Sequence, residues 1–464
     1  MAKILSRVQQ GKKRFLRAER YMALGFGLLI LTGALLLWLP LSSASGTCTS
    51  WPDALFTAAT SVCVTGLVTV TTATHWSLFG KAVILCLIQL GGLGIVACVT
   101  GVMMVLGQRI SLGARKRIAD SYNLEHITGV VGMVRRIVKG TLCVEALGAV
   151  PYAFVFIPEY GPARGLFYAV FHAVSAFCNA GIDILGEDSL AAYVTNPVVN
   201  INTMLLIIMG GIGFTVWFEV AAQWKKGNLA RGPKKFWRGL SLHTRLAVCI
   251  TAFLILSGAL LILLLDWNHS GSLGPLSAPQ KVLAALFQSV TLRTAGFQTI
   301  PQQDFTDASA CVGLVLMFVG GSPMGTAGGM KTTTVGIVFL MTWAYLHGKE
   351  HPEVFGRRLR DEDTRTALVV ICCGFAVAFA GTMLLAVTSD ASFLDVLYEV
   401  VSAVGTVGLT RGITGNLGTA AKLVLVAVMY AGRLGPITLA MAVTRRAGGR
   451  KKSVRLPEKR ILIG

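Results

Sequence analysis

The chain has 464 residues, of which 54% are hydrophobic and only 14% are charged. An ordinary soluble domain carries roughly 25% charged residues, so this composition excludes disordered and collagenous proteins and argues against a soluble enzyme. The net charge is +20, which in a soluble protein would suggest nucleic acid. Here, however, 34 of the 42 Lys and Arg residues gather in five blocks, at 3–20, 109–139, 225–245, 349–365 and 445–460. Basic blocks between long apolar runs are typical of an integral membrane protein, and no nucleic acid is expected as a partner.

Eight apolar runs are long enough to cross a bilayer and are predicted to be helices. They lie at 22–41, 77–106, 134–157, 197–224, 246–266, 308–346, 366–388 and 419–444. A signal peptide is the alternative for the first run, with 42–44 as its cleavage site. Because the run has about 20 residues and a signal core has roughly 7–15, we expect a retained transmembrane helix.

A shorter apolar stretch separates the two members of each successive pair of runs. These stretches are too short to span a membrane and too apolar for ordinary loops, which favours re-entrant helices shielded by protein, at 53–65, 165–180, 281–293 and 393–407. All five basic blocks fall on the side opposite these stretches. By the positive-inside rule, that side is the cytoplasm, and both termini are expected there.

The re-entrant stretches end in related strings that start with Ser and close on a glycine followed by an apolar residue, namely SVCVTGL (61–67), SAFCNAGI (175–182), SVTLRTAGF (289–297) and SAVGTVGL (402–409). Their glycines, Gly66, Gly181, Gly296 and Gly408, are separated by 115, 115 and 112 residues. This period predicts an all-α integral membrane protein with four pseudo-symmetric helix–pore-helix–helix repeats around a central ion pore. The repeats are expected at 22–106, 107–224, 225–347 and 348–444, between basic tails at 1–21 and 445–464.

A second glycine-rich string lies inside the second run of each repeat, as GGLG (91–94), GGIG (210–213), GGSPMGTAGG (320–329) and GRLG (432–435). No strand–turn–helix context surrounds these strings, so a dinucleotide-binding motif is excluded. Close helix packing or a local break in the helix is expected instead.

Four short helices that converge on one axis can present rings of backbone carbonyls to a dehydrated cation, with their negative C-terminal ends aimed at it. The pore-loop glycines, together with GGSPMGTAGGMKTTT in the sixth run, resemble the Trk/Ktr/HKT superfamily of potassium transporters, most closely the membrane subunits of bacterial Ktr systems. The resemblance covers nearly the whole chain. It implies K⁺ coordination by a filter made of Val64, Thr65, Gly66, Asn179, Ala180, Gly181, Thr294, Ala295, Gly296, Thr406, Val407 and Gly408.

Glycine in all four loops, rather than Ser in the first, points by resemblance to potassium. A sodium-preferring or sodium-coupled transporter of the same fold is the alternative. The resemblance also makes the loop 320–330 an intramembrane gate below the filter, on which Arg433 acts, whereas a fixed structural kink is the plainer interpretation. The expected gate residues are Gly320, Gly321, Ser322, Pro323, Gly325, Thr326, Gly328, Gly329, Lys331 and Arg433.

Several charges fall at membrane depth. Lys331 and Arg433 are expected to pair with loop carbonyls or with an acid, and Arg293 to point away from the axis and pair behind its pore helix. Three acids, Asp53, Asp395 and Glu399, lie at or near the starts of pore helices, where they suit the helix dipole or attract cations to the mouth. For Glu145 and Glu219 the sequence names no partner.

The resemblance further implies a homodimer with the C-terminal ILIG in its interface and a cytosolic nucleotide-binding regulatory ring of the RCK type. The basic loops are expected to face this ring or membrane lipids. The location implied is a bacterial plasma membrane. No cofactor is expected in this chain, the transported ion being K⁺ with Na⁺ dependence left open. An intramembrane hydrolase built on Ser175 and His172 is the alternative from another class, and no enzyme activity is expected.

Overall fold

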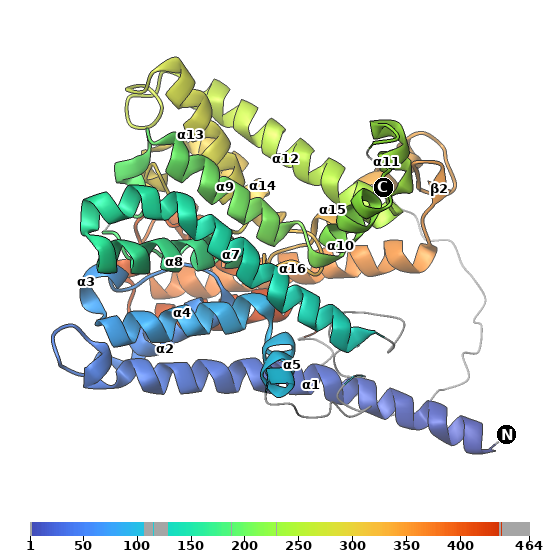
Figure 1. Ribbon diagram of the computed structural model, residues 1–464, viewed down its shortest axis with the longest axis horizontal. Helices are drawn as coiled ribbons and strands as arrows, with labels where there is room; N and C mark the ends of the chain where they lie inside the picture. The colour runs from blue at the N-terminus through green and yellow to red at the C-terminus, as the bar shows by residue number, and fades with distance from the viewer. Residues whose placement is uncertain are drawn as a thin grey trace.

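The computed structural model describes residues 2–105, 115, 129–186, 188–228, 230–435 and 438. Within this part the chain is mostly helical (Figure 1). The one sheet formed by the described residues is a two-stranded antiparallel hairpin, β1 (Glu353–Val354) and β2 (Arg357–Arg358), which pairs Glu353 with Arg358. A mostly helical integral membrane protein, as the sequence predicted, is therefore the observed class of fold.

The first run of each expected repeat forms a long unbroken helix. These helices are α1 (Ala2–Trp38), α7 (Val130–Tyr160), α12 (Leu242–Asp266) and α16 (Asp361–Thr388). All four are long and apolar enough to cross a membrane. Large apolar side chains on their outer faces remain exposed, among them Leu28, Phe253 and Phe379. Faces of this kind suit contact with lipid rather than with water.

A short helix, which we call the pore helix of its repeat, follows each long one and is buried on nearly all sides. These are α2 (Trp51–Cys63), α8 (Pro162–Cys178), α13 (Ala278–Thr291) and α17 (Phe393–Gly405). Serine caps fix the starts of two of them, since the Ser50 and Ser392 hydroxyls accept the backbone N–H of Asp53 and Asp395. The protein around them supplies the shield that helices too short to span a bilayer require.

The second run of each repeat is interrupted in the structure. The segments are α4 (Leu78–Leu93) with α5 (Ile95–Val105), α9 (Pro197–Gly211) with α10 (Phe214–Lys225), α14 (Asp307–Phe318) with α15 (Thr332–Leu346), and α18 (Thr419–Leu434). The axes of α9 and α10 differ by 97°. Gly94, Gly213 and Gly435 follow the first segments with φ of 83°, 95° and 83° and ψ of 139°, 139° and 137°. Residues with a Cβ rarely adopt this conformation, so the last glycine of each four-residue string lies at the break in the helix.

The first glycine of the same strings serves close packing. A Cβ placed on Gly91, Gly210 or Gly432 would collide with the backbone carbonyl of Val62, Phe177 or Val404 respectively. Each of these carbonyls lies near the end of the pore helix of the same repeat. A close contact and a break, the two expectations for the second glycine set, therefore occur together in each of the three four-residue strings.

The long helices run roughly side by side across the view in Figure 1. The start of α1, the short helix α11 (Pro233–Gly239) and the hairpin lie at one end of the molecule. The turn from α7 to α8 and the single-turn helix α3 (Thr72–His75) lie at the other. The short turns η1 (Pro40–Ser42), η2 (Ala191–Tyr193), η3 (Gln302–Asp304) and η4 (Thr414–Asn416) complete the loops. Two clusters of buried apolar side chains surround the pore helices, which positions the ends of these helices inside the protein.

Candidate ion-conducting site

The chain leaves each pore helix through the same unusual backbone geometry. Val64, Asn179, Thr294 and Thr406 have φ of 56°, 60°, 65° and 50°, although none is glycine. Two residues later Gly66, Gly181, Gly296 and Gly408 have φ of 103°, 63°, 82° and 92°. The residues between them (Thr65, Ala180, Ala295 and Val407) keep negative φ. Non-glycine residues seldom adopt positive φ, so four instances at matching positions indicate a backbone held in place by its surroundings.

The four glycines meet, each against the loop of the next repeat. A Cβ placed on Gly66 would lie 2.5 Å from the carbonyl oxygen of Ala180, one on Gly181 would lie 2.5 Å from that of Ala295, and one on Gly296 would lie 2.5 Å from that of Val407. A Cβ on Gly408 would collide with the carbonyl oxygen of Thr65 and so close the circle. Eight of the twelve residues named from the sequence thus form one closed ring of backbone contacts, in which the carbonyl oxygen of the residue before each glycine lies against the glycine of another repeat.

A hydroxyl from each pore helix binds the backbone near its glycine. Thr60 Oγ1 and Ser402 Oγ accept the N–H groups of Gly66 and Gly408 at 2.9 and 3.0 Å. In the other two repeats Ser175 Oγ donates to the carbonyl of Ile182 at 2.6 Å, and Thr291 Oγ1 donates to that of Phe297 at 2.5 Å. The serines that begin the strings of the first and third repeats are bound elsewhere. Ser61 donates to the Thr57 carbonyl of its own helix, and Ser289 donates to Ile255.

The loop 320–330 replaces the simple break in the third repeat. Backbone hydrogen bonds tie it to the break in the second repeat, from Ser322 N to Gly211 O at 2.8 Å, from Thr326 N to Gly210 O at 3.0 Å and from Phe214 N to Met324 O at 3.0 Å. Its two ends are held together by Gly320 N donating to Met330 O at 2.9 Å and by Thr332 N donating to Gly321 O at 3.0 Å. Pro323 packs against the break at Gly213, and Gly329, at φ 66°, turns the chain back.

The same loop touches the inner end of the glycine ring. Thr326 Oγ1 donates to the carbonyl of Phe177 at 3.0 Å and lies 3.3 Å from Asn179 Oδ1. A Cβ on Gly328 would collide with Thr406 Oγ1. The polar side-chain atoms Asn179 Nδ2, Thr294 Oγ1 and Thr406 Oγ1 are buried there without a protein partner. The loop therefore lies directly against the residues that end the second and fourth pore helices.

Three cationic side chains, those of Arg433, Lys331 and Arg293, donate to backbone carbonyls in or next to the loop. Arg433 donates through Nη1 to Thr326 O at 2.6 Å and through Nη2 to the carbonyls of Gly91 and Gly92, at 3.3 Å for the latter. Lys331 donates to Ala327 O at 2.7 Å. Of the two partners expected for these cations, carbonyls or an acid, the described residues provide carbonyls.

Arg293 also reaches the loop. Its Nη2 donates to Gly320 O at 3.2 Å, and its side chain is buried. Its partner is thus the first carbonyl of the loop, and the expectation that it points away from the axis stays a prediction. The third pore helix is thereby joined to the start of the segment that lies under the ring.

Acids at the outer ends of two pore helices are neutralised by cations of neighbouring segments. Asp53 accepts from Lys422 Nζ at 2.6 Å, and Asp395 accepts from Arg411 Nε at 2.7 Å. Burial opposes ionisation of Asp53, but hydrogen bonds from Lys422 and Ser50 hold its pKa below the ordinary value. Both aspartates also lie in the first turn of a helix, which suits the dipole. Capping and pairing thus account for them better than attraction of free cations. Glu399 is buried and accepts from the Thr414 hydroxyl.

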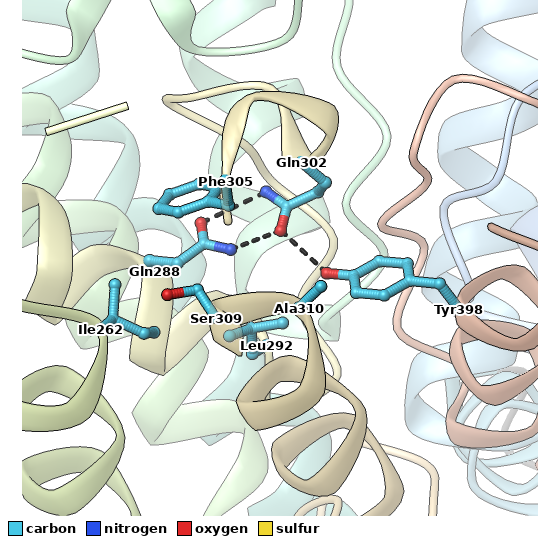
Figure 2. A pocket seen from close by; sticks show the side chains of 8 residues that line it. All are labelled: Ile262, Gln288, Leu292, Gln302, Phe305, Ser309, Ala310 and Tyr398. Atoms are coloured by element: carbon cyan, nitrogen blue, oxygen red, sulfur yellow. Dashed lines mark hydrogen bonds between the residues drawn. The ribbon is translucent and has the colours of Figure 1, made fainter. Parts of the chain in front are cut away.

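A polar network behind the third and fourth pore helices has no counterpart in the sequence predictions. Figure 2 shows Gln302 between Gln288 of α13 and Tyr398 of α17. Tyr398 donates to Gln302 Oε1 at 2.9 Å, and Gln302 Nε2 donates to Gln288 Oε1 at 3.3 Å. These residues line a small cavity with Ser309 and Phe305. The segment that follows Gly296 is thereby fixed to two pore helices.

The remaining intramembrane groups have structural partners. Glu145 accepts from Gln89 Nε2 at 3.2 Å, and Cys178 Sγ lies 3.8 Å from its other oxygen. Glu219 accepts from the hydroxyls of Ser241 and Thr244 at the start of α12. The hydroxyl of Ser175 is occupied by Ile182, and His172 Nδ1 contacts the Tyr168 carbonyl at 2.7 Å. In the described part of the chain no three His, Cys, Asp or Glu side chains are placed to hold a metal ion.

Comparison with known proteins decides the family. The model of the family described as TrkH, cation transport protein, matches residues 19–448. The chain belongs to this family. A potassium/sodium uptake protein NtpJ from Enterococcus hirae is 37% identical over 456 residues, which cover 97% of this chain and 98% of the relative.

Two further relatives extend the likeness. The Ktr system potassium uptake protein B of Bacillus subtilis is 37% identical over 443 residues, which cover 96% of each chain. The crystal structure of the potassium transporter TrkH from Vibrio parahaemolyticus shares the fold, with a TM-score of 0.70 at 20% identity over 91% of this chain and 84% of that one. The family consists of membrane cation transport proteins rather than enzymes, so the hydrolase alternative has no support.

Proposed function

We propose that the chain is the potassium-conducting membrane subunit of a Ktr-type uptake system. The observation that carries the proposal is the ring formed by Gly66, Gly181, Gly296 and Gly408, each of which lies against a backbone carbonyl oxygen of another repeat. Carbonyl oxygens can replace the hydration shell of a potassium ion, and four pore helices direct their negative ends toward it. The names of the B. subtilis and E. hirae relatives support potassium as the ion.

In this proposal K⁺ enters from the outer side, loses water in the ring and passes the loop 320–330 toward the cytoplasm. The membrane potential drives this step with about 2.3 kcal/mol per charge at 100 mV. The loop acts as the gate, since it contacts Asn179 and Thr406 and is held by Arg433. The proposed filter residues are the twelve named from the sequence, and the four repeats are the units 22–106, 107–224, 225–347 and 348–444.

The basic segments support a cytoplasmic location for one end of the molecule, and with it an inside position for both termini in a bacterial plasma membrane. An open cleft there is lined by Arg231, Lys234, Lys235 and Arg238. Such a cleft suits the acidic groups of lipids or of a regulatory ring. A homodimer and a nucleotide-binding ring of the RCK type complete the proposed system, in keeping with relatives named as parts of a Ktr system.

Rubidium flux into proteoliposomes, with and without sodium, tests the proposal. We expect an outward K⁺ gradient, which makes the vesicle interior negative, to drive Rb⁺ entry, and Gly66→Ser to reduce the preference for Rb⁺ over Na⁺. Failure of the purified protein to move Rb⁺ or K⁺ would refute it. Rescue of a potassium-uptake-deficient strain gives the same test in cells.

A sodium-preferring or sodium-coupled transporter is the second candidate, because the E. hirae relative is named a potassium/sodium uptake protein. Flux that requires Na⁺, or that carries Na⁺ in preference to Rb⁺, would favour it.

A further inference from the structure

The four pore-helix hydroxyls that bind the ring backbone fall into two kinds. In the first and fourth repeats Thr60 and Ser402 accept the N–H of the ring glycine. In the second and third repeats Ser175 and Thr291 donate to the carbonyl of the residue after the glycine. All four side chains are fully buried, so water does not compete for these bonds.

The first kind of bond determines where a ring carbonyl points. The N–H of Gly66 and the C=O of Thr65 belong to one planar trans peptide, in which the two groups point in opposite directions. When Thr60 draws the N–H toward the pore helix, the Thr65 oxygen must face away from that helix. It lies against Gly408 of the neighbouring repeat.

The same relation holds one repeat away. Ser402 binds the N–H of Gly408, and the oxygen of Val407 in that peptide lies against Gly296. The second kind of bond orients a carbonyl toward the pore helix instead of away from it. The carbonyls of Ile182 and Phe297 point back toward Ser175 and Thr291, so these two oxygens are turned away from the ion path.

We propose that Thr60 and Ser402 are selectivity-determining positioning residues, which keep the Thr65 and Val407 carbonyls aimed at the ion by binding the amide of the following glycine. Ser175 and Thr291 hold the outer carbonyls of their loops off the path. Without its acceptor, the buried amide of Gly66 or Gly408 seeks another partner, and rotation of its peptide removes one oxygen from the ring. The inference rests on the proposed conduction through this ring.

The test compares neighbouring hydroxyls. Thr60→Val removes the acceptor while keeping the shape, and Ser402→Ala does so in the fourth repeat. Thr60→Ser and Ser402→Thr restore it. Ser61→Ala is the matched control, because the Ser61 hydroxyl is bound to Thr57 of its own helix. Each protein is purified, checked for monodispersity, and assayed in proteoliposomes for Rb⁺ and Na⁺ uptake.

We expect Thr60→Val and Ser402→Ala to lower the Rb⁺ to Na⁺ uptake ratio by about two- to tenfold, the range that the loss of one hydrogen bond produces. The rescue variants and Ser61→Ala should keep the wild-type ratio. Ser175→Ala and Thr291→Val should change the ratio less than Thr60→Val does, since the oxygens they release are not in the ring.

The outcomes separate the inference from the function on which it rests. A wild-type protein that moves no alkali cation refutes the proposed function, and with it the inference. A wild type that conducts, with Thr60→Val and Ser402→Ala equal to Ser61→Ala in ratio, refutes the inference alone. Should a hydroxyl-free variant fail to fold, the Thr60→Ser and Thr60→Cys pair decides the case. Cysteine, a weaker acceptor, must then show the lower ratio, and equal ratios overturn the inference.

Discussion

Arg433 offers the most direct test of the intramembrane loop as a gate. Its guanidinium holds the loop through Thr326 O, while its other contacts, to Gly91 and Gly92, lie outside the loop. If the loop moves away, Arg433 can keep its contacts with α4 and loses only the bond to Thr326. A hydrogen bond from a charged group contributes about 1.5–3 kcal/mol. Because 1.4 kcal/mol corresponds to roughly a tenfold change, loss of this bond should favour the displaced loop by about 10- to 150-fold.

Two substitutions separate the hydrogen bond from the charge. Arg433→Met removes both, whereas Arg433→Lys keeps the charge but removes the fork that spans the loop and α4. We expect both variants to raise Rb⁺ flux in proteoliposomes, and Arg433→Met to raise it more, since a fixed positive charge near the ion path also opposes cations. A rise confined to Arg433→Met would assign the effect to charge alone.

Lys81 supplies the control, because it too donates to a backbone carbonyl, that of Ala73 at 2.6 Å, but touches no residue of the loop. Lys81→Met should leave flux unchanged. Monodisperse Arg433→Met protein with wild-type or lower flux would refute the assignment of this residue to a closed gate.

Three further predictions concern the ring, the helix packing and the outer loop. Gly296→Ala should reduce the selectivity for Rb⁺ over Na⁺ at least tenfold, because the new Cβ would lie 2.5 Å from Val407 O at a residue whose φ is 82°. Gly132→Ala is the control and should not alter uptake ratios, because a Cβ at this helical site would meet no neighbouring segment within 4 Å. Gly91→Ala should destabilise the protein by about 1–3 kcal/mol, seen as a lower unfolding midpoint in detergent, because its Cβ would meet the Val62 carbonyl; Gly101→Ala, with its nearest neighbour 3.6 Å away, should unfold like the wild type. Burial raises the pKa of Asp183 to about 6, against hydrogen bonds from the Leu185 and Gly186 amides that lower it. The native state therefore binds an extra proton between pH about 4 and 6, so the unfolding midpoint should fall as pH rises through this window, and the fall should be smaller in Asp183→Asn. An equal fall in both proteins would contradict the assignment.

The sequence predicted the helices well because apolar length and charge placement determine them. The runs at 134–157, 246–266 and 366–388 coincide with α7, α12 and α16, and the glycine period located all four pore-helix ends. The sequence did not show which of two adjacent side chains in a helix reaches the ring backbone. Thr60 and Ser61 are adjacent and chemically alike, and only the direction in which each side chain leaves the helix decides which one reaches the backbone of Gly66.

A single sequence also does not predict contacts between side chains of distant segments. Tyr398 and Gln302 are 96 residues apart, and neither belongs to a repeated string, so no pattern joins them before the helices pack. Arg293 shows the same difficulty in another form. Its position three residues before Gly296 suggested a charge to be kept away from the pore, but the folded chain offers it the carbonyl of Gly320.

The loop 320–330 belongs to one repeat but is bound by all four. Backbone bonds fix it to Gly210 and Gly211 of the second repeat, Arg293 holds its start from the third, and Arg433 of the fourth links it to Gly91 and Gly92 of the first. Most of these partners are carbonyls at a helix break or next to one, where an α-helix leaves oxygens without an internal donor. The breaks therefore do more than bend the second helix of each repeat. They free the acceptors that hold a polar, glycine-rich segment at membrane depth, where an unsatisfied backbone would otherwise cost several kcal/mol per group.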